Sequence, residues 1–117
     1  MSFAERFEDL EIWQRARTLN QQVYKALQTC KDYSFRDQMQ RAALSVMNNI
    51  SEGFERRTKK DFAHFLDLAK GSAGEVRSMT FAAEDIEILN VTAAQRLRVS
   101  YEMLSRQIAS FQKHLRA

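Results

Sequence analysis

The residues whose types and spacing could support a reaction are few. Asp61 and His64 stand three positions apart, the spacing of a metal-ligand pair on one helix face, but di-iron bundles need two Glu-x-x-His pairs and two further glutamates. The only other histidine, His114, has Phe111 three positions before it. Cys30 has no histidine near it in the sequence, which favours a turn or core position over a nucleophile. We therefore predict no catalytic residue, no metal site, no cofactor and no enzymatic activity.

The densest run of cations is the segment Arg56-Arg57-Thr58-Lys59-Lys60. Contacts to nucleic-acid phosphates need flexible cations gathered on one surface, and a turn at this place supplies them. Phe54 lies two residues before the run and could stack on a base if it were exposed. An ordinary solvated turn accounts for the same residues equally well, so both interpretations stay open.

Composition predicts one soluble, globular, all-α domain. Of the 117 residues, 44% are hydrophobic and 28% are charged, and with three glycines and no proline few positions can interrupt a helix. The single cysteine excludes an intrachain disulfide and fits a reducing compartment. No apolar run approaches the roughly 20 residues of a membrane span, and the acidic segment Met1 to Glu11 does not resemble a signal peptide. We expect a single cytoplasmic domain over residues 1–117 without membrane contact, and its formal charge of +3 allows an anionic partner.

Apolar residues recur every three or four positions over four segments, which predicts four amphipathic helices. Their expected ranges are about 8–29, 34–52, 59–88 and 92–115. Capping signals stand at the start of the last three, at Ser34–Asp37, Thr58–Asp61 and Thr92–Gln95. Gly53 is expected to end the second helix in the left-handed conformation, with a continuing helix as the alternative. Short turns between the helices predict an all-α, up-down-up-down antiparallel four-helix bundle.

The third predicted helix has small residues in its middle. Gly71 and Gly74 lie there, and a glycine inside a helix costs about 1 kcal/mol relative to alanine. A cost of that kind suggests that a neighbouring backbone must come close. The segment is not a phosphate-binding loop, because the amide groups of a helix interior are already used.

Antiparallel helices joined by a short turn pair residues at a nearly constant index sum. About a turn near residue 56, Gln38 falls level with Glu75 and Arg41 falls level with Ser72. We predict a partly buried Arg41–Glu75 ion pair, with Gln38 and Ser72 in the same network; the alternative is two exposed charges that contribute less than about 1 kcal/mol. The same register brings the cationic turn beside the end of the last helix, with Lys113, His114 and Arg116, and leaves Glu84, Asp85 and Glu87 at the opposite end.

The second and third predicted helices carry a recognisable set of residues. The set comprises Gln38, Arg41-Ala42-Ala43, Ser45, Asn49-Ile50-Ser51-Glu52-Gly53, Phe62, Phe65-Leu66, Ala69, Gly71-Ser72 and Glu75, with Phe7 to Trp13 and Tyr24 in the first helix. In these residues the chain resembles the four-helix-bundle family first named from proteins encoded in the intervening sequence of bacterial 23S ribosomal RNA genes. Usual members have alanine where this chain has Ser51. The resemblance covers nearly the whole chain and is loosest over the fourth helix.

The resemblance implies a bundle that assembles into a ring-like homo-oligomer, commonly a pentamer. It also implies that ribosomal RNA or another nucleic acid is a candidate partner. A related branch, the accessory proteins of diversity-generating retroelements, looks like a basic pentameric barrel that binds nucleic acid and a reverse transcriptase. Within the family motif, structural roles are expected for Gln38, Arg41, Asn49, Glu52, Gly53, Ser72 and Glu75.

Large apolar residues outside the predicted core stripes give weak, independent support for subunit contacts. They are Leu44, Met47, Phe54, Phe81, Val99 and Met103. A wide stripe that turns some of them inward is the alternative.

Two hypotheses of function follow. The first is a non-enzymatic bundle that binds RNA or other nucleic acid through its basic end. The candidate phosphate contacts are Arg56, Arg57, Lys59, Lys60, Lys113 and Arg116. The second is a protein-interaction scaffold, for example an accessory subunit of a reverse transcriptase, in which the same cations serve solubility.

Overall fold

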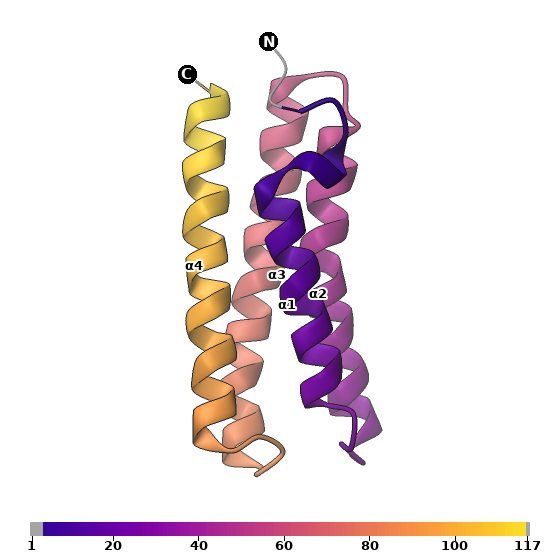
Figure 1. Ribbon diagram of the computed structural model, residues 1–117, viewed down its shortest axis with the longest axis vertical. Helices are drawn as coiled ribbons and strands as arrows, with labels where there is room; N and C mark the ends of the chain where they lie inside the picture. The colour runs from indigo at the N-terminus through magenta and orange to yellow at the C-terminus, as the bar shows by residue number, and fades with distance from the viewer. Residues whose placement is uncertain (1–3, 117) are drawn as a thin grey trace.

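Four helices run alternately up and down the long axis of a rod that measures 47 × 20 × 19 Å (Figure 1), which confirms the predicted four-helix bundle. The computed structural model describes residues 4–116. The helices are α1 (Glu11–Ala26), α2 (Tyr33–Phe54), α3 (Lys59–Asp85) and α4 (Val91–Arg116), and a short 3-10 turn, η1 (Phe7–Asp9), precedes α1. The first three residues of the acidic N-terminal segment lie outside the described residues.

The core forms where the apolar stripes of the four helices meet. Each helix contributes residues spaced by three or four positions, as expected for one buried face per helix. On α4 the buried residues include Leu97, Tyr101, Leu104, Ile108 and Leu115, whereas the predicted core residue Phe111 is only half-buried. None of the helices between residues 4 and 116 combines the length and the apolarity that a membrane crossing requires.

The helix starts depend on three capping side chains. Thr58 accepts a hydrogen bond from the backbone N–H of Asp61 at 3.0 Å, which confirms the predicted cap of α3. The other two predicted caps, Ser34 and Thr92, are wrong. Asp32 caps α2 and Asn90 caps α4, each two positions earlier in the chain. Aspartate and asparagine are at least as favourable as serine and threonine at this position, so each helix begins at the earlier residue.

Two helices are shorter than predicted. Leu10 has an extended backbone (φ −74°, ψ 128°) and a buried side chain, so the chain turns into the core there and α1 begins only at Glu11. α3 was expected to reach Ile88 but ends at Asp85, because Glu87 adopts a left-handed conformation with φ of 60°. That turn directs the backbone N–H groups of Ile88 and Leu89 to the carbonyl oxygen of Ala83.

Gly53 does not end α2. None of the glycines in the described part of the chain has a positive φ, and α2 continues to Phe54. A Cβ at position 53 would lie 2.7 Å from Cβ of Phe65 and 2.9 Å from a ring carbon of Phe62. Gly53 is therefore required for the close approach of α2 to α3, and the alternative of a continuing helix holds.

Gly71 and Gly74 differ from Gly53 in their surroundings. A Cβ at either position would meet no other atom within 4 Å among the described residues. The close packing that the sequence suggested at these two glycines is therefore not found inside the single chain.

Candidate nucleic-acid interface

The α2–α3 turn and the C-terminus of α4 lie at the same end of the rod (Figure 1). The register prediction is therefore correct in bringing the turn cations and the α4 cations to one end. We call this surface the basic end. Its predicted members are all exposed: Arg56, Arg57, Lys59, Lys60, Lys113 and Arg116.

Two of these cations are engaged within the chain. The Arg56 guanidinium lies 4.6 Å from the ring centroid of Phe65, and Arg116 lies 3.8 Å from a carboxylate oxygen of Asp67. The side chains of Arg57, Lys59 and Lys60 form no ion pair with any residue between 4 and 116. These three, together with Lys113 of α4, which is also exposed and without an ion-pair partner among residues 4–116, are therefore the cations best placed to contact an external anion.

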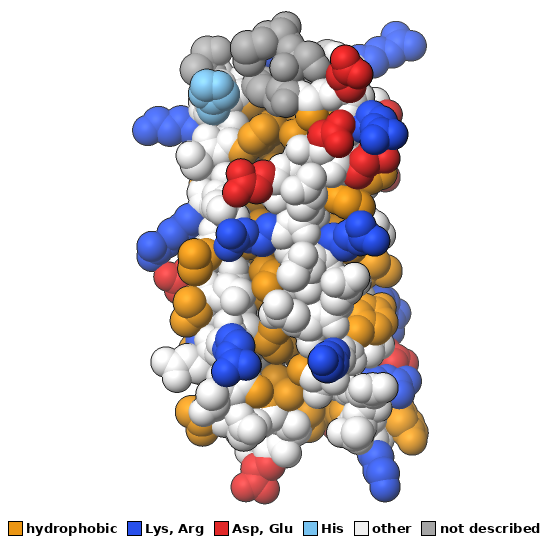
Figure 2. All heavy atoms as spheres, in the orientation of Figure 1, with side chains coloured by type: hydrophobic (Ala, Val, Ile, Leu, Met, Phe, Trp, Pro, Cys, Tyr) orange, Lys and Arg blue, Asp and Glu red, His pale blue; other side chains and the backbone are white. Residues whose placement is uncertain are grey.

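Carboxylates share the basic end and reduce its net charge. Glu8 and Asp9 belong to η1 at this end, and Glu55 and Asp61 flank the cationic turn. Figure 2 shows lysine and arginine side chains at several levels along the face formed by α4 and α1, not only at one end. The basic end is thus a local cluster of cations, and cations are not confined to this end of the rod as the placement of Glu84, Asp85 and Glu87 at the opposite end suggested.

Phe54 is not placed to stack on a base. It is half-buried and packs edge-on against Phe62, with ring centroids 6.0 Å apart and an interplanar angle of 90°. The condition for base stacking, an exposed ring, is therefore not met, because Phe54 is still part of α2 and packs against the core.

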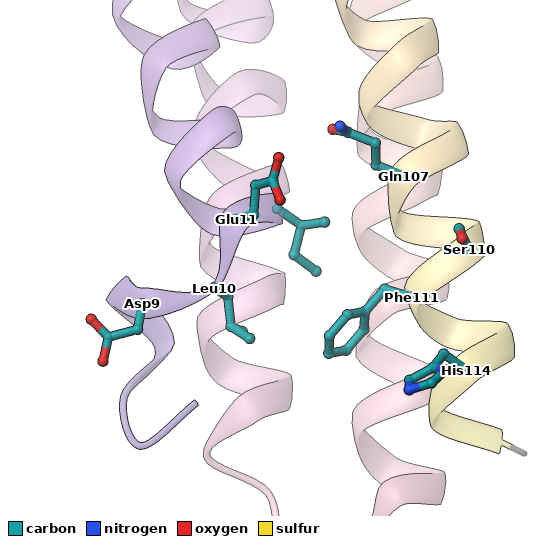
Figure 3. A pocket seen from close by; sticks show the side chains of 8 residues that line it. Asp9, Leu10, Glu11, Gln107, Ser110, Phe111 and His114 are labelled. Carbon is teal, nitrogen blue, oxygen red and sulfur yellow. The ribbon is translucent and has the colours of Figure 1, made fainter. Parts of the chain in front are cut away.

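A pocket of about 550 Å³ opens beside the basic end, between the start of α1 and the last turns of α4 (Figure 3). The pocket forms because α1 begins only at Glu11. The last turns of α4 therefore extend past the start of α1 and have no α1 turn packed against them. The Glu11 and Gln107 side chains point toward each other across the opening, over Phe111. The side-chain amide oxygen of Gln107 (Oε1) is buried without a hydrogen-bond partner among the described residues. Between residues 4 and 116, no group of three or more His, Cys, Asp or Glu side chains could hold a metal ion.

The family-motif residues line the seam between α2 and α3. Gln38 donates to the Glu75 carboxylate at 3.4 Å, as the predicted register requires, whereas Ser72 shares a hydrogen bond of 2.9 Å with Ser45, one turn of α2 beyond Arg41. Asn49 donates to the backbone carbonyl and the hydroxyl of Ser45, both at 2.9 Å.

The predicted ion pair across this seam is wrong. Arg41 and Glu75 line the same cleft of about 580 Å³, but no ion pair joins them or links either to another described residue. Arg41 is exposed, and Gln38 takes the place that Arg41 was expected to occupy beside Glu75.

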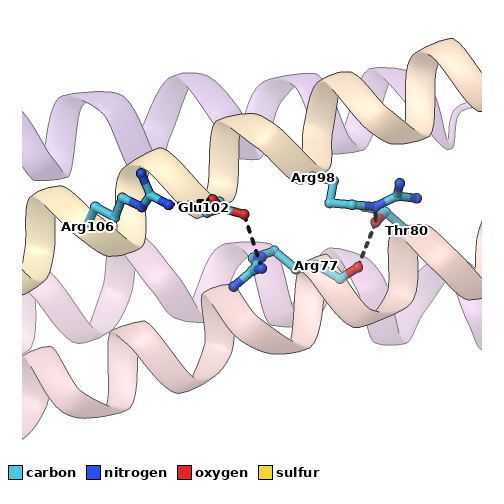
Figure 4. A network of polar contacts seen from close by, with 5 residues as sticks. All are labelled: Arg77, Thr80, Arg98, Glu102 and Arg106. Carbon is cyan, nitrogen blue, oxygen red and sulfur yellow. Dashed lines mark hydrogen bonds and ion pairs between the residues drawn. The ribbon is translucent and has the colours of Figure 1, made fainter.

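A second polar seam, between α3 and α4, was missed by the sequence analysis (Figure 4). Glu102 accepts from Arg77 at 3.3 Å and from Arg106 at 2.9 Å. The Arg98 guanidinium donates to the Thr80 hydroxyl at 3.0 Å and also pairs with Glu84 at 3.1 Å. The antiparallel register that located the α2–α3 pairs would also have found these, had it been applied to the turn between α3 and α4.

Gln112 is another residue that the sequence analysis missed. It is buried within the last turns of α4 and donates to the Ala63 carbonyl oxygen and to the Asp67 carboxylate, both at 2.8 Å. The hydrogen bond from Gln112 is the main cause that lowers the pKa of Asp67 below its ordinary value, and Lys70 and Arg116 act in the same direction. These contacts fix the end of α4 against α3, next to the basic end.

Comparisons with known proteins agree with the fold. A family model described as 23S rRNA-intervening sequence protein matches residues 8–110. A crystal structure of a protein of unknown function from the S23 ribosomal protein family of Bacteroides thetaiotaomicron superposes with a TM-score of 0.81 at 18% identity, covering 87% of this chain and 98% of that chain. No curated protein matches the sequence.

Proposed function

Because this chain belongs to the 23S rRNA-intervening sequence protein family, we propose that it is a non-enzymatic cytoplasmic bundle that binds RNA through the basic end. The observation that carries the proposal is the α2–α3 turn, where Arg57, Lys59 and Lys60 are exposed and have no ion-pair partner among residues 4–116. Flexible exposed cations are the groups that contact phosphates without reading sequence.

The start of α3 adds to the attraction for phosphate. Thr58 caps this helix, and the first backbone N–H groups of a helix carry a partial positive charge. Lys59 and Lys60 stand in that first turn, where cations are unfavourable for the helix itself. Their presence is therefore better explained by an external anion than by the stability of α3.

We propose further that the chain forms a homo-oligomer, with the pentameric ring of the resemblance as the expected form. A single cationic turn next to carboxylates is a modest site. Repetition of the turn around a ring would multiply the number of phosphates contacted, and each phosphate neutralised steepens the salt dependence of binding.

The direct test is an anisotropy titration with a labelled fragment of 23S ribosomal RNA at low salt. Replacing Arg56, Arg57, Lys59 and Lys60 by alanine should weaken binding by at least about tenfold. The matched comparison is Lys59→Ala/Lys60→Ala against Lys25→Ala/Lys31→Ala, since both double variants lose two exposed cations. No binding by the wild type, or equal loss in the two double variants, would contradict the proposal.

A protein-interaction scaffold is the second candidate function. It is favoured by the large apolar side chains of Leu44, Phe81, Val99 and Met103, which are exposed as expected, whereas Met47 and Phe54 pack against the core. On this account the cations serve solubility, and a partner such as a nucleic-acid enzyme binds an apolar face. Retention of partner binding in the variant without the four turn cations, together with absent RNA binding, would favour it.

A further inference from the structure

We infer that the outer α2–α3 seam of one chain docks on the outer α1–α4 side of a second copy, so that the contact is made by two different surfaces. This inference rests on the proposed homo-oligomer and names the faces that form it. We call the surfaces the α2–α3 face (Arg41, Leu44, Glu52, Leu68, Gly71, Glu75) and the α1–α4 face (Glu11, Arg15, Arg96, Val99, Met103).

The α2–α3 face has apolar residues and space that the single chain does not use. Leu44 and Leu68 are 37% and 43% exposed. Leu68, Gly71 and Glu75 follow a three-then-four spacing, which places them on one stripe of α3. Because a Cβ at Gly71 would meet nothing within 4 Å among the described residues, the glycine leaves room for another chain rather than for a neighbour in its own.

The same face carries charges that are not neutralised within the chain. From the residues that the structure describes, Glu75 receives a single side-chain hydrogen bond, the long 3.4 Å bond from Gln38. Neither Glu75 nor the exposed Glu52 has an ion-pair partner between residues 4 and 116, and Arg41 also has none. Two carboxylates against one guanidinium leave this face with an excess of negative charge.

The α1–α4 face has the complementary character. Val99 and Met103 are 50% and 49% exposed, and Arg96 stands on the same stripe of α4. A groove of about 400 Å³ lies on the same side and is lined by Glu11, Arg15, Leu19 and Ser100 among others. Arg15 and Arg96 have no ion-pair partner in the described part of the chain, and two guanidinium groups against the Glu11 carboxylate leave this face with an excess of positive charge. Figure 2 shows the blue lysine and arginine side chains along the middle of this side.

The two faces lie on opposite sides of the rod. α2 contacts α1 and α3, and α4 contacts α3 and α1, so the α2–α3 and α1–α4 seams are opposite sides of a square of helices. A contact between two different surfaces leaves one of each surface free on the growing assembly, so further copies can add in the same way. The assembly closes into a ring when the rotation between neighbouring copies brings the last copy back to the first. If the rods stand side by side and point the same way, the α2–α3 turns of all copies lie at the same end of the ring. The basic ends would then form one continuous cationic surface.

The experiment is sedimentation of two face variants, alone and mixed. Leu68→Lys/Glu75→Lys changes the α2–α3 face, and Val99→Asn/Met103→Asn changes the α1–α4 face without adding a charge that could attract the new lysines. All four side chains are exposed, so folding should persist and is checked by circular dichroism. The wild type should sediment as several chains and each variant as one chain. An equimolar mixture should give a species of two chains, because one intact pair of complementary faces remains.

Matched controls are Lys31→Glu and Asp85→Lys, which reverse charges away from both faces and should leave the assembly unchanged. A wild type that sediments as a single chain would overturn both the proposed oligomer and the faces. An assembled wild type whose size is unaffected by the face variants would overturn the faces alone. A mixture that stays at one chain would also overturn the inference, since identical surfaces would then form the contact.

Discussion

At the scale of single residues, the same amino acid has opposite roles at two places. Gly53 is buried directly against Phe62 and Phe65 of α3, whereas Gly71 is exposed with open space around it. Both are helical, so backbone freedom explains neither position. What differs is the neighbour across the helix face, and a sequence pattern does not contain that information.

This contrast predicts effects of opposite sign on stability. Gly53→Ala should lower the free energy of unfolding by about 1–3 kcal/mol, because its Cβ would overlap Phe62 and Phe65. Gly71→Ala should raise it by up to about 1 kcal/mol through helix propensity. Urea unfolding followed by Trp13 fluorescence at low protein concentration measures both. A stabilising Gly53→Ala would show that the close approach of α2 and α3 is looser than described.

Tyr101 gives a second test at this scale. It is fully buried, its hydroxyl has no hydrogen-bond partner among the described residues, and burial raises its pKa above the ordinary value. A buried hydroxyl without a partner costs about 1–3 kcal/mol, so Tyr101→Phe should be neutral or stabilising at neutral pH.

The raised pKa of Tyr101 also fixes a pH dependence. Because ionisation is harder in the folded state, its contribution to stability is fully present below the unfolded pKa of about 10 and is lost as pH rises above it. Thermal unfolding from about pH 8 to 11 should show this decline in the wild type and less of it in Tyr101→Phe. Identical alkaline profiles in the two proteins would mean that the phenol reaches water.

At the scale of elements, the sequence predicted the number, order and direction of the helices because apolar periodicity over 15 or more residues is a strong signal. It located the ends less well. Asp32 and Asn90 could have been recognised as caps from residue type alone, since both are favoured there. The end of α3 at Asp85 could not have been recognised from residue type, because glutamate does not favour the left-handed conformation that Glu87 adopts.

Glu87 therefore offers a stabilising substitution at the end of α3. A non-glycine residue in the left-handed conformation is strained, and a carboxylate near a helix C-terminus opposes the helix dipole. Glu87→Gly should raise the free energy of unfolding by about 1 kcal/mol, as measured by urea midpoints. The matched control is Ala82→Gly, at an exposed position inside α3, which should be destabilising by about 1 kcal/mol.

The stabilising contact between Asp67 of α3 and Gln112 of α4 should depend on pH in the acidic range. The hydrogen bond from Gln112 lowers the pKa of Asp67 below 3.8, so the carboxylate stabilises the fold above that value, and its contribution is lost as pH falls through the lower folded pKa. The wild type should lose stability between about pH 5 and 2.5, and Asp67→Asn should remove part of that loss. The effect is small because the carboxylate is half exposed. Parallel acid profiles would show that the Gln112–Asp67 contact does not persist in solution.

At the scale of the whole molecule, the antiparallel register correctly placed the turn cations beside the end of α4 and Gln38 level with Glu75. It could not decide which charges pair, because Arg41 and Gln38 compete for the same carboxylate and the difference depends on helix phase. The burial of Phe54 could not be decided for a related reason, since it depends on α2 continuing two residues beyond its expected end at residue 52. The exposed stripes on opposite sides of the rod became visible only when all four helices were packed together.

The central claim is that the α2–α3 turn neutralises phosphates, and the salt dependence of RNA binding tests it most directly. The slope of log affinity against log salt reports the number of phosphates neutralised, at about 0.7–0.9 per contact. The variant with alanine at Arg56, Arg57, Lys59 and Lys60 should have a slope shallower than the wild type by about 2–3. Equal slopes for the two proteins would contradict the claim, whatever their affinities.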